Sequence, residues 1–291
     1  MEHERGDMIT IIIPTRNRER QLAQCMDALA DQTASGDFVV IIGDDHSDYD
    51  VAEQVEAHRL SKLVNCRTVK DKGRGAAVAR NEAAKHATGN ILAFLDDDAI
   101  PNENWVSEIY QAFDIQGTYC ITGRVLPLQS GLFSKSRQAR YDARRCKAMS
   151  EENQEARFLA GGNAAISRKL FEELRGFDQD FVMMHDFELL IRVRAQGYIC
   201  RYVDEMVVHH QHVKRRSDAF LNSFRAGAYR FLLTKKHDGY RTTIFAEIGD
   251  IFCDVFKKNI EAGLAIKTFN LILNCIHLTG FIFAKIGVNK G

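Results

Sequence analysis

Residues 90–101 read NILAFLDDDAIP and place an apolar segment directly before three adjacent carboxylates. The apolar segment, residues 91–95, is typical of a β-strand that is buried on both faces. Asp96, Asp97 and Asp98 follow it without a spacer. Like charges this close repel one another and raise each other's pKa unless a positive group lies among them. The stretch therefore predicts a strand that ends either at a cation site or in a solvated acidic turn.

The first hundred residues alternate apolar runs with helical patterns. This alternation predicts right-handed βαβ units around a parallel sheet. After residue 100 the pattern is mixed, and from residue 217 onward it is helical. We therefore predict an α/β chain with a mostly parallel, Rossmann-like sheet flanked by helices and a helical C-terminal extension. The apolar runs that predict the buried strands are 8–13, 38–43, 63–69 and 91–95.

Polar clusters follow each of the four predicted strands. They read PTRNR, GDDHSD, KDKGRG and DDDAIP, so two are acidic and two carry arginine or lysine. Ligands bind beyond the carboxyl ends of the strands in open α/β sheets, so we expect all four clusters at one edge of the sheet. Carboxylates next to cationic groups suit a divalent metal and a phosphorylated ligand together.

Composition excludes little, but it sets the compartment that we expect. Lys plus Arg equals Asp plus Glu at 39 each, so the net charge of the 291 residues indicates no partner. The seven cysteines include no CxxC pair, which argues against a disulfide framework and a zinc knuckle. The N-terminal stretch MEHERGDMIT lacks the apolar core of a signal peptide. We expect a cytoplasmic protein with reduced thiols.

Six blocks of the sequence resemble family 2 glycosyltransferases of the GT-A fold, and they occur in the family's order over roughly residues 8–240. They read TIIIPTRNR, IIGDDHSD, RGAAVARN, FLDDDAIP, GGNAAISRKLFEELRGFDQDF and HDFELLIRVRAQG. The resemblance implies a metal-dependent, inverting glycosyltransferase that uses a nucleotide-diphosphate sugar, with a UDP-sugar as the expected donor. It also implies a catalytic domain over 1–215, with a donor half at about 8–100 and an acceptor half at about 101–215. Residues 216–291 form the expected extension.

The resemblance assigns a metal to the acidic cluster. Asp96-x-Asp98 is the family's DxD pattern, and the oxygen ligands suit Mn²⁺ or Mg²⁺. By resemblance, Asp98 binds the metal directly, while Asp96 and Asp97 face the donor ribose or the water shell of the metal. A histidine after the last strand contacts the metal or diphosphate in related enzymes, so the expected metal residues are Asp98, Asp96 and His210, with His209 as the competitor for the last place. An acidic turn that caps the next helix is the alternative reading of the cluster.

Three further blocks are expected to bind the rest of the donor. A carboxylate after the second strand can accept the N3–H of uracil or thymine, as the equivalent position does in the family. Glycines in KGRGAAVARN permit close backbone approach, and the following helix N-terminus favours phosphate. An ordinary turn and a surface arginine are the alternatives for these two blocks. The predicted donor-binding residues are Pro14, Thr15, Arg16, Asn17, Asp44, Asp45, Arg74, Arg80, Asn81, Asp96 and Asp97.

The catalytic base is expected at Asp186, because HDFELLIR matches the family's Glu-Asp-x-Glu-Leu-x-x-Arg block. Inverting transfer needs a carboxylate that takes the proton of the acceptor hydroxyl as its oxygen attacks the anomeric carbon. A helix N-terminal acid that complements the helix dipole is the alternative. His185 stands where glutamate is common, so it either tunes Asp186 or contacts the acceptor. The predicted acceptor-binding residues are Gly161, Gly162, Asn163 and His185.

Two basic stretches and an apolar tail suggest how the acceptor is reached. Residues 124–147 and 209–241 each carry a net charge of +6, which suits anionic phospholipid or a polyprenyl diphosphate. No nucleic-acid motif accompanies them, so we expect no nucleic-acid partner. Residues 268–284 form 17 residues without a charge, fewer than the roughly 20 of a membrane span. A helix at the membrane surface, a homodimer contact and intramolecular packing remain open for this segment.

The expected role is sugar transfer to a glycan or lipid-linked saccharide in cell-surface polysaccharide biosynthesis, in the cytoplasm at the inner face of the membrane. A sugar nucleotidyltransferase is the first alternative, but such enzymes usually carry a Gly-rich loop after the first strand, and PTRNRERQ has no glycine. A non-catalytic nucleotide-sugar-binding scaffold is the second alternative, and it would not need both Asp98 and Asp186.

Overall fold

The computed structural model describes residues 8–33, 38–71, 73–211, 216–238, 240 and 264–288. The chain divides into two compact units. The first unit comprises Met1–Leu126 and Lys147–His210, and the second comprises Pro127–Cys146 and Gln211–Gly291. We expected one boundary near residue 215, but residues 127–146 group with the C-terminal part, because side chains of this segment hydrogen-bond to the last helix.

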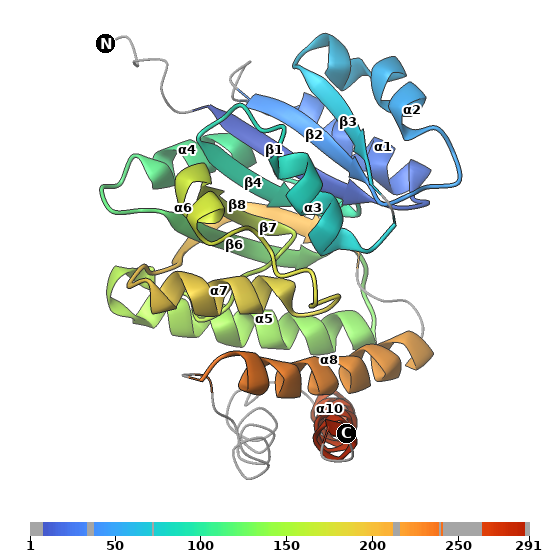
Figure 1. Cartoon of the computed structure of the whole chain (residues 1–291), viewed down its shortest axis with the longest axis vertical. Helices are drawn as coiled ribbons and strands as arrows, with labels where there is room; N and C mark the ends of the chain where they lie inside the picture. The colour runs from blue at the N-terminus through green and yellow to red at the C-terminus, as the bar shows by residue number, and fades with distance from the viewer. Residues whose placement is uncertain are drawn as a thin grey trace. The chain divides into compact units, whose positions relative to one another are not determined.

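The first unit is built on an eight-stranded sheet of order β3-β2-β1-β4-β7-β6-β8-β5 (Figure 1). The four N-terminal strands pair in parallel, as the βαβ pattern predicts. The β4–β7, β6–β7 and β5–β8 pairings are antiparallel, so the whole sheet is mixed. The strands are β1 (Ile9–Thr15), β2 (Phe38–Asp44), β3 (Cys66–Lys70), β4 (Ile91–Leu95), β5 (Ala99–Pro101), β6 (Cys120–Pro127), β7 (Asn163–Ser167) and β8 (Arg201–His210).

Helices flank this sheet and close its core (Figure 1). Every residue of β1 and of β4 is buried, as expected of apolar central strands. Helix α1 buries Leu22, Cys25, Met26 and Leu29, the face that its helical spacing predicts. The helical elements are α1 (Glu19–Ala30), α2 (Val51–Ala57), η1 (Arg59–Lys62), α3 (Ala76–Ala84), α4 (Trp105–Phe113), η2 (Glu152–Gln154), α6 (Arg168–Glu173) and α7 (His185–Ala195).

Strand register brings distant polar residues to one edge of the sheet. Thr15 at the end of β1 pairs with Asp44 at the end of β2, and Asp44 pairs with Lys70 at the end of β3. At the opposite end of the strand order, Ala99 of β5 pairs with His210 of β8. The short β5 strand follows the three aspartates directly, so this pairing sets the last residue of β8 beside the acidic turn.

The second unit contains α5 (Leu132–Ser150, through residue 146), α8 (Arg216–Lys236) and α10 (Leu264–Val288). Helices α8 and α10 pack closely, because a Cβ on Gly227 would overlap the carbonyl of His277 and one on Gly280 would overlap that of Phe224. Residues 212–215 and 241–263, within and beyond the second basic stretch, lie outside the described residues.

Helix α10 contains the apolar tail that the sequence singles out. Its segment Ile266–Ile286 has a mean hydropathy of 1.5 over its apolar window and is long enough to cross a membrane by length and composition alone. In that window, 28% of the residues are buried within the chain. Internal packing therefore accounts for only part of this segment.

Candidate active site

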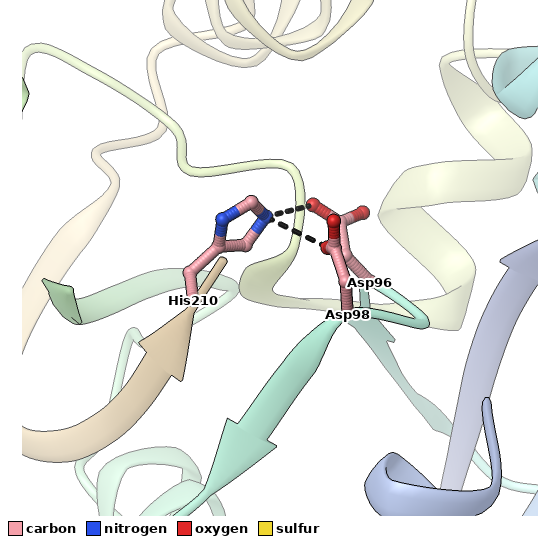
Figure 2. A group of neighbouring side chains, drawn as sticks. All are labelled: Asp96, Asp98 and His210. Carbon is pink, nitrogen blue, oxygen red and sulfur yellow. Dashed lines mark hydrogen bonds and ion pairs between the residues drawn. The ribbon is translucent and has the colours of Figure 1, made fainter. Parts of the chain in front are cut away.

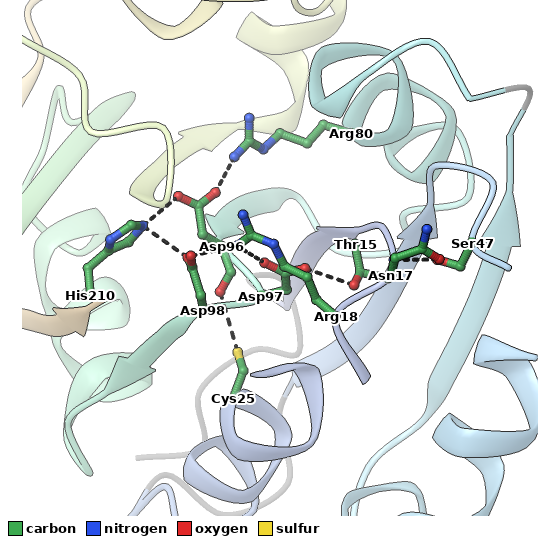
Figure 3. A network of polar contacts seen from close by, with 10 residues as sticks. All are labelled: Thr15, Asn17, Arg18, Cys25, Ser47, Arg80, Asp96, Asp97, Asp98 and His210. Carbon is green, nitrogen blue, oxygen red and sulfur yellow. Dashed lines mark hydrogen bonds and ion pairs between the residues drawn. The ribbon is translucent and has the colours of Figure 1, made fainter. Parts of the chain in front are cut away.

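Each carboxylate of the acidic turn has a positive partner, as Figure 3 shows. Arg80 Nη2 of α3 lies 2.5 Å from Asp96 Oδ1. Arg18 Nη1, just before α1, lies 3.1 Å from Asp97 Oδ1 and 2.5 Å from Asp98 Oδ2. The positive charges that the three aspartates require therefore come from helices that follow other strands: Arg18 directly precedes α1, and Arg80 lies within α3. The acidic turn is thus a charge-compensated cluster at the edge of the sheet.

Asp96, Asp98 and His210 form a group that could hold a metal ion (Figure 2). One ligand atom from each lies within 4.8 Å of the others. His210 Nε2 is 3.2 Å from Asp96 Oδ2 and 3.1 Å from Asp98 Oδ1. Two carboxylate oxygens and one imidazole nitrogen fit Mn²⁺, and three protein ligands leave positions for the oxygens of a substrate. His209 pairs with Ile100 one position back along β8, so its side chain points to the opposite face.

The proton on His210 is held in the place where a cation would bind. Burial by itself lowers the pKa of His210, but the hydrogen bonds to Asp96 and Asp98 outweigh it and raise this pKa to about 10. Desolvation opposes ionisation of Asp96 and Asp98, yet hydrogen bonds to His210 keep the pKa of both carboxyls below the usual value. A metal ion that bound this imidazole would therefore have to displace a proton.

Asp97 faces β1 and is the buried member of the acidic turn. Thr15 Oγ1 donates a hydrogen bond of 2.8 Å to Asp97 Oδ2, and Arg18 contacts the other oxygen. Burial raises the pKa of Asp97 to about 6, although the charge of Arg18 and the bond from Thr15 lower it. Asp97 thus links the turn to β1, while its two neighbours in sequence face His210.

A polar cavity of about 400 Å³ opens at the ends of β2 and β3. Asp44 lines it, is buried, and accepts a 2.8 Å hydrogen bond from the Ser47 backbone N–H. Asp45 points elsewhere: its Oδ1 accepts from the Gly75 N–H at 2.8 Å, and its Oδ2 lies 3.6 Å from Arg16 Nη1. The full lining is Asp44, Ser47, Asp48, Tyr49, Asp50, Val51, Ala52, Thr68 and Lys70.

Arg80 joins α3 to α7 across the acidic turn. Its side chain is only 3% exposed, which excludes the alternative of a surface arginine. Besides Asp96 it contacts His185, with Nη1 at 2.6 Å from Nε2. A guanidinium can only donate, so Nε2 accepts and the ring proton lies on Nδ1. Burial and the charge of Arg80 lower the pKa of His185, in keeping with a neutral imidazole.

The backbone of Gly161 and Gly162 lies next to the side chains of Asp186 and Asp96. The N–H of Gly161 donates a 3.3 Å hydrogen bond to Asp186 Oδ2, and the half-buried Asp186 lies in the first turn of α7. A Cβ on Gly161 would lie 3.2 Å from the Cβ of Asp186, and one on Gly162 would overlap the carboxylate of Asp96. Because residues 161 and 162 have no side chains, the carboxylates of Asp186 and Asp96 can both lie close to this segment of backbone.

Two predicted site residues lie in the core instead of a ligand pocket. Asn163 is fully buried, its Oδ1 accepts from Trp105 Nε1, and its Nδ2 donates to the carbonyls of Arg124 and Met206. Asn81 is buried as well and bonds both the N–H and the carbonyl of Phe177. We assign both asparagines a structural role, because their amide groups are already occupied by the protein.

The remaining predicted donor-binding residues lie around the same edge of the sheet, but they contact the acidic turn less directly. Pro14 is buried within β1, and Arg74 is exposed in the loop before α3. Asn17 has a left-handed φ of 54° and donates to Asp48 Oδ2 at 2.7 Å, so it holds the loop next to the cavity. Arg18 was not predicted, although it lies in the same PTRNR block as Arg16 and compensates two of the three aspartates.

Comparisons with known proteins place this geometry in a family. The model of the family described as "Glycosyl transferase family 2" matches residues 10–175. The O-antigen chain rhamnosyltransferase RfbN of Salmonella typhimurium is 28% identical over 229 residues, which are 76% of this chain and 72% of that protein. Chondroitin synthase of Escherichia coli is 26% identical over 245 residues, and the match spans 70% of this chain but only 35% of the synthase.

Solved structures of low sequence identity share the fold. The mannosyltransferase PcManGT of Pyrobaculum calidifontis, in complex with GDP-Man and Mn²⁺, has a TM-score of 0.65 at 19% identity and covers 96% of this chain and 76% of its own. Residues 1–349 of S. aureus TarS, in complex with UDP-GlcNAc, have a TM-score of 0.60 at 13% identity and cover 98% of this chain and 92% of that one. These likenesses establish the GT-A fold that the six sequence blocks predict.

Proposed function

Because this chain belongs to glycosyl transferase family 2, we propose that it is a metal-dependent, inverting enzyme that transfers a sugar from a nucleotide-diphosphate donor. The observation that carries the proposal is the convergence of Asp96, Asp98 and His210 beside Arg18 and Arg80. Family membership selects the glycosyltransferase over the nucleotidyltransferase, and the remaining proposals concern the metal, the donor, the base and the acceptor.

Asp98, Asp96 and His210 would hold the divalent ion, either Mn²⁺ or Mg²⁺. Such an ion supplies stabilisation of the negative charge on the leaving nucleoside diphosphate. Arg18 and Arg80 each contact this group, so positive charge surrounds the carboxylates on two sides. With the charge of the leaving group compensated in this way, the residues at this edge need not supply a general acid.

The cavity at the ends of β2 and β3 would take the base of the nucleotide. Asp44 is a buried acceptor on its wall and could receive the N3–H of uracil, which favours a UDP-sugar as donor. A guanine base offers N1–H and N2–H₂ donors to a carboxylate, so GDP is the competitor. The structural neighbours carry both classes, GDP-Man in one case and UDP-GlcNAc in the other.

Asp186 would act as the general base. Its carboxylate accepts only the Gly161 N–H and the neighbouring Phe187 N–H in the bonds described, which leaves acceptor positions for the proton of a sugar hydroxyl. His185 would hold Arg80 rather than contact the acceptor, because its Nε2 is engaged by the guanidinium. The bare backbone of Gly161 and Gly162 gives room for the acceptor sugar beside the base.

A glycan or lipid-linked saccharide of cell-surface polysaccharide biosynthesis is the proposed acceptor. The relatives that support this class are named for O-antigen and chondroitin synthesis. The reaction would take place in the cytoplasm at the inner face of the membrane, consistent with the exposed apolar part of α10.

Nucleotide binding tests the donor and metal assignments together. Thermal unfolding is measured with UDP, GDP, dTDP or CMP, each with and without Mn²⁺, on the wild type and on Asp98→Ala and Asp98→Asn. A ligand at 100 times its Kd is expected to add about 2.7 kcal/mol of stability. A rise with one diphosphate that needs Mn²⁺ and is lost in both variants supports the site. The absence of any metal-dependent rise would overturn it.

Turnover tests the base separately from donor binding. The release of nucleoside diphosphate is measured in two assays. In the first, water is the only acceptor and the donor is hydrolysed slowly; in the second, a pool of lipid-linked saccharides is added. Asp186→Asn is expected to keep the Mn²⁺-dependent nucleotide shift and to lose at least a hundredfold in transfer, within the usual contribution of general base catalysis. Transfer at the wild-type rate in this variant would remove Asp186 from the base role.

A further inference from the structure

The guanidinium group of Arg80 connects the acidic turn to the start of α7. Its Nη2 lies 2.5 Å from Asp96 Oδ1, and its Nη1 lies 2.6 Å from His185 Nε2. Figure 3 shows the first of these contacts. The side chain of Arg80 is 3% exposed, so both contacts are shielded from water, where a hydrogen bond is electrostatically stronger than at the surface. Each terminal nitrogen therefore holds one partner, and the two partners come from segments far apart in the sequence.

His185 offers Arg80 a neutral acceptor. Protonation of Nε2 would remove the acceptor and set a second positive charge against the guanidinium group. Burial and the charge of Arg80 both lower the pKa of His185, which keeps the imidazole neutral. The ion pair described for Arg80 is with Asp96, and a neutral partner on the other nitrogen leaves this ion pair undivided.

One aromatic ring supports both members of the pair. The guanidinium carbon of Arg80 lies 5.6 Å from the ring centroid of Phe177, and the ring of His185 packs edge-on against the same ring at 5.3 Å. Asn81, the next residue of α3, holds the backbone of Phe177. Its Nδ2 donates to the Phe177 carbonyl at 2.7 Å, and its Oδ1 accepts from the Phe177 N–H at 2.8 Å. Helix α3 thus fixes the pair twice, by its own arginine and by the segment that Asn81 binds.

The start of α7 depends on this contact for its anchor. His185 is the first residue of the helix and Asp186 is the second. Met184, at the N-cap, has a left-handed φ of 63° and makes no side-chain hydrogen bond to the helix start. The usual capping bond is therefore missing at this end. The bond from Arg80 to His185 holds the turn of helix that presents the proposed base.

We propose that His185 is a positioning residue that ties the proposed base to the proposed metal site through Arg80. A hydrogen-bonded chain runs from Asp96 to Arg80 to His185, and Asp186 follows His185 directly. The placement of Asp96 depends on this chain at one end, and the orientation of Asp186 depends on it at the other. A base must lie within hydrogen-bond reach of the proton that it takes, so a small shift of α7 slows transfer. The catalytic part of this inference rests on the function proposed above, whereas the contact itself is tested without metal or substrate.

The first experiment measures the contact in the metal-free protein by a double-mutant cycle. His185→Leu removes the acceptor and Arg80→Met removes the donor. Urea unfolding in EDTA is compared for the wild type, the two single variants and the double variant. Because the two groups bond each other, the loss of stability caused by His185→Leu is expected to be at least halved in the Arg80→Met background. Equal losses in both backgrounds would mean that the two residues are not coupled and would overturn the proposal.

The second experiment distinguishes positioning from contact with the acceptor. The Kd of the nucleoside diphosphate at saturating Mn²⁺ is measured together with kcat and with KM for the saccharide acceptor. The amide oxygen of His185→Gln reaches the place of Nε2, whereas that of His185→Asn reaches only the place of Nδ1. His185→Asn is expected to raise the Kd at least fivefold and to lower kcat at least tenfold, with KM for the acceptor within twofold of the wild type. His185→Gln is expected to restore most of both losses.

Phe171→Leu is the control for damage to the core, because the ring of Phe171 lies 5.4 Å from that of Phe177. It is expected to lower stability without changing the Kd or kcat. A rise in KM for the acceptor alone would make His185 an acceptor contact, and equal losses in the Asn and Gln variants would mean that the ring itself is needed; either result would overturn the proposal. A wild type that binds no nucleotide would overturn the proposed function and the catalytic role of His185 with it, while the coupling measured in EDTA would still report on the contact.

Discussion

The carboxyl group of Asp97 is buried between β1 and the acidic turn, and this burial raises its pKa to about 6. The folded protein therefore holds a proton there more tightly than the unfolded chain, in which an aspartate titrates near 3.9. The stability that this proton contributes is fully present below the unfolded pKa and is lost as the pH rises through about 6. At neutral pH the ionised Asp97 costs stability, which its contacts with Arg18 and Thr15 offset only in part.

Asp97→Asn is expected to remove this pH dependence. Urea unfolding of the metal-free wild type and variant is compared at pH 4 and pH 7. Between these two values the stability of the variant relative to the wild type is expected to improve by about 2 kcal/mol. The comparison cancels the titration of groups that do not interact with Asp97, and the exposed Asp114→Asn serves as the control. A difference that does not change with pH would show that Asp97 titrates as an ordinary carboxyl.

The pKa of His210 is raised to about 10, well above that of Asp97, and this proton would compete with a metal ion at the proposed site. Its pKa of about 10 means that the metal-free protein carries an imidazolium at neutral pH, so the ion must displace one proton. The Kd for Mn²⁺ is therefore expected to fall about tenfold per pH unit between pH 6.5 and 8.5. Calorimetry in two buffers of different ionisation enthalpy counts the released proton directly. His210→Asn keeps a possible ligand without a titrating ring, and its Kd is expected to vary far less with pH; an equal slope in both proteins would contradict the assignment.

The loop between η2 and β7 depends on two glycines for its path between the acids. A Cβ on Gly162 would overlap the Asp96 carboxylate. A Cβ on Gly161 would lie 3.2 Å from the Cβ of Asp186, a close contact that a small shift of the side chain relieves. Gly162→Ala is therefore expected to raise the Kd for Mn²⁺ at least tenfold. Gly161→Ala is expected to leave Mn²⁺ binding within twofold and to slow transfer. The two Kd values and the two transfer rates check this, and the reverse pattern would exclude the described path of the loop.

Strands and their ends could be predicted from the sequence, but the partners of the acids could not. Ile91–Leu95 is a continuous apolar run, so β4 and the aspartates after it follow from pattern alone. Arg80 is different, because only the packing of α3 makes a helical arginine face Asp96. The contacts of Asn163 could not be predicted for the same reason, because an amide at the start of a strand gives the same sequence pattern whether it binds a sugar or accepts a hydrogen bond from Trp105. The grouping of residues 127–146 with α10 depends on long-range contacts that carry no sequence signal.

The residues of the proposed metal site and the proposed base all belong to the first of the two units of the chain. Asp96, Asp98 and Asp186 lie in the segments Met1–Leu126 and Lys147–His210, and His210 is the last residue of that unit. The described residues that line a cavity among α5, α8 and α10, in contrast, all belong to the second unit. This division predicts that damage to the helical unit lowers the stability of the protein without changing the affinity of the metal site.

Gly227→Ala tests that independence. A Cβ at this position would overlap the carbonyl of His277, and backbone atoms cannot rotate away as a side chain can, so α8 and α10 would have to separate. Overpacking of this kind costs about 1–3 kcal/mol, so calorimetric unfolding is expected to begin several degrees lower. The Kd for Mn²⁺, measured well below that temperature, is expected to stay within twofold, with the exposed Ser217→Ala as the control. A metal affinity that falls together with the stability would show that the helical unit supports the site.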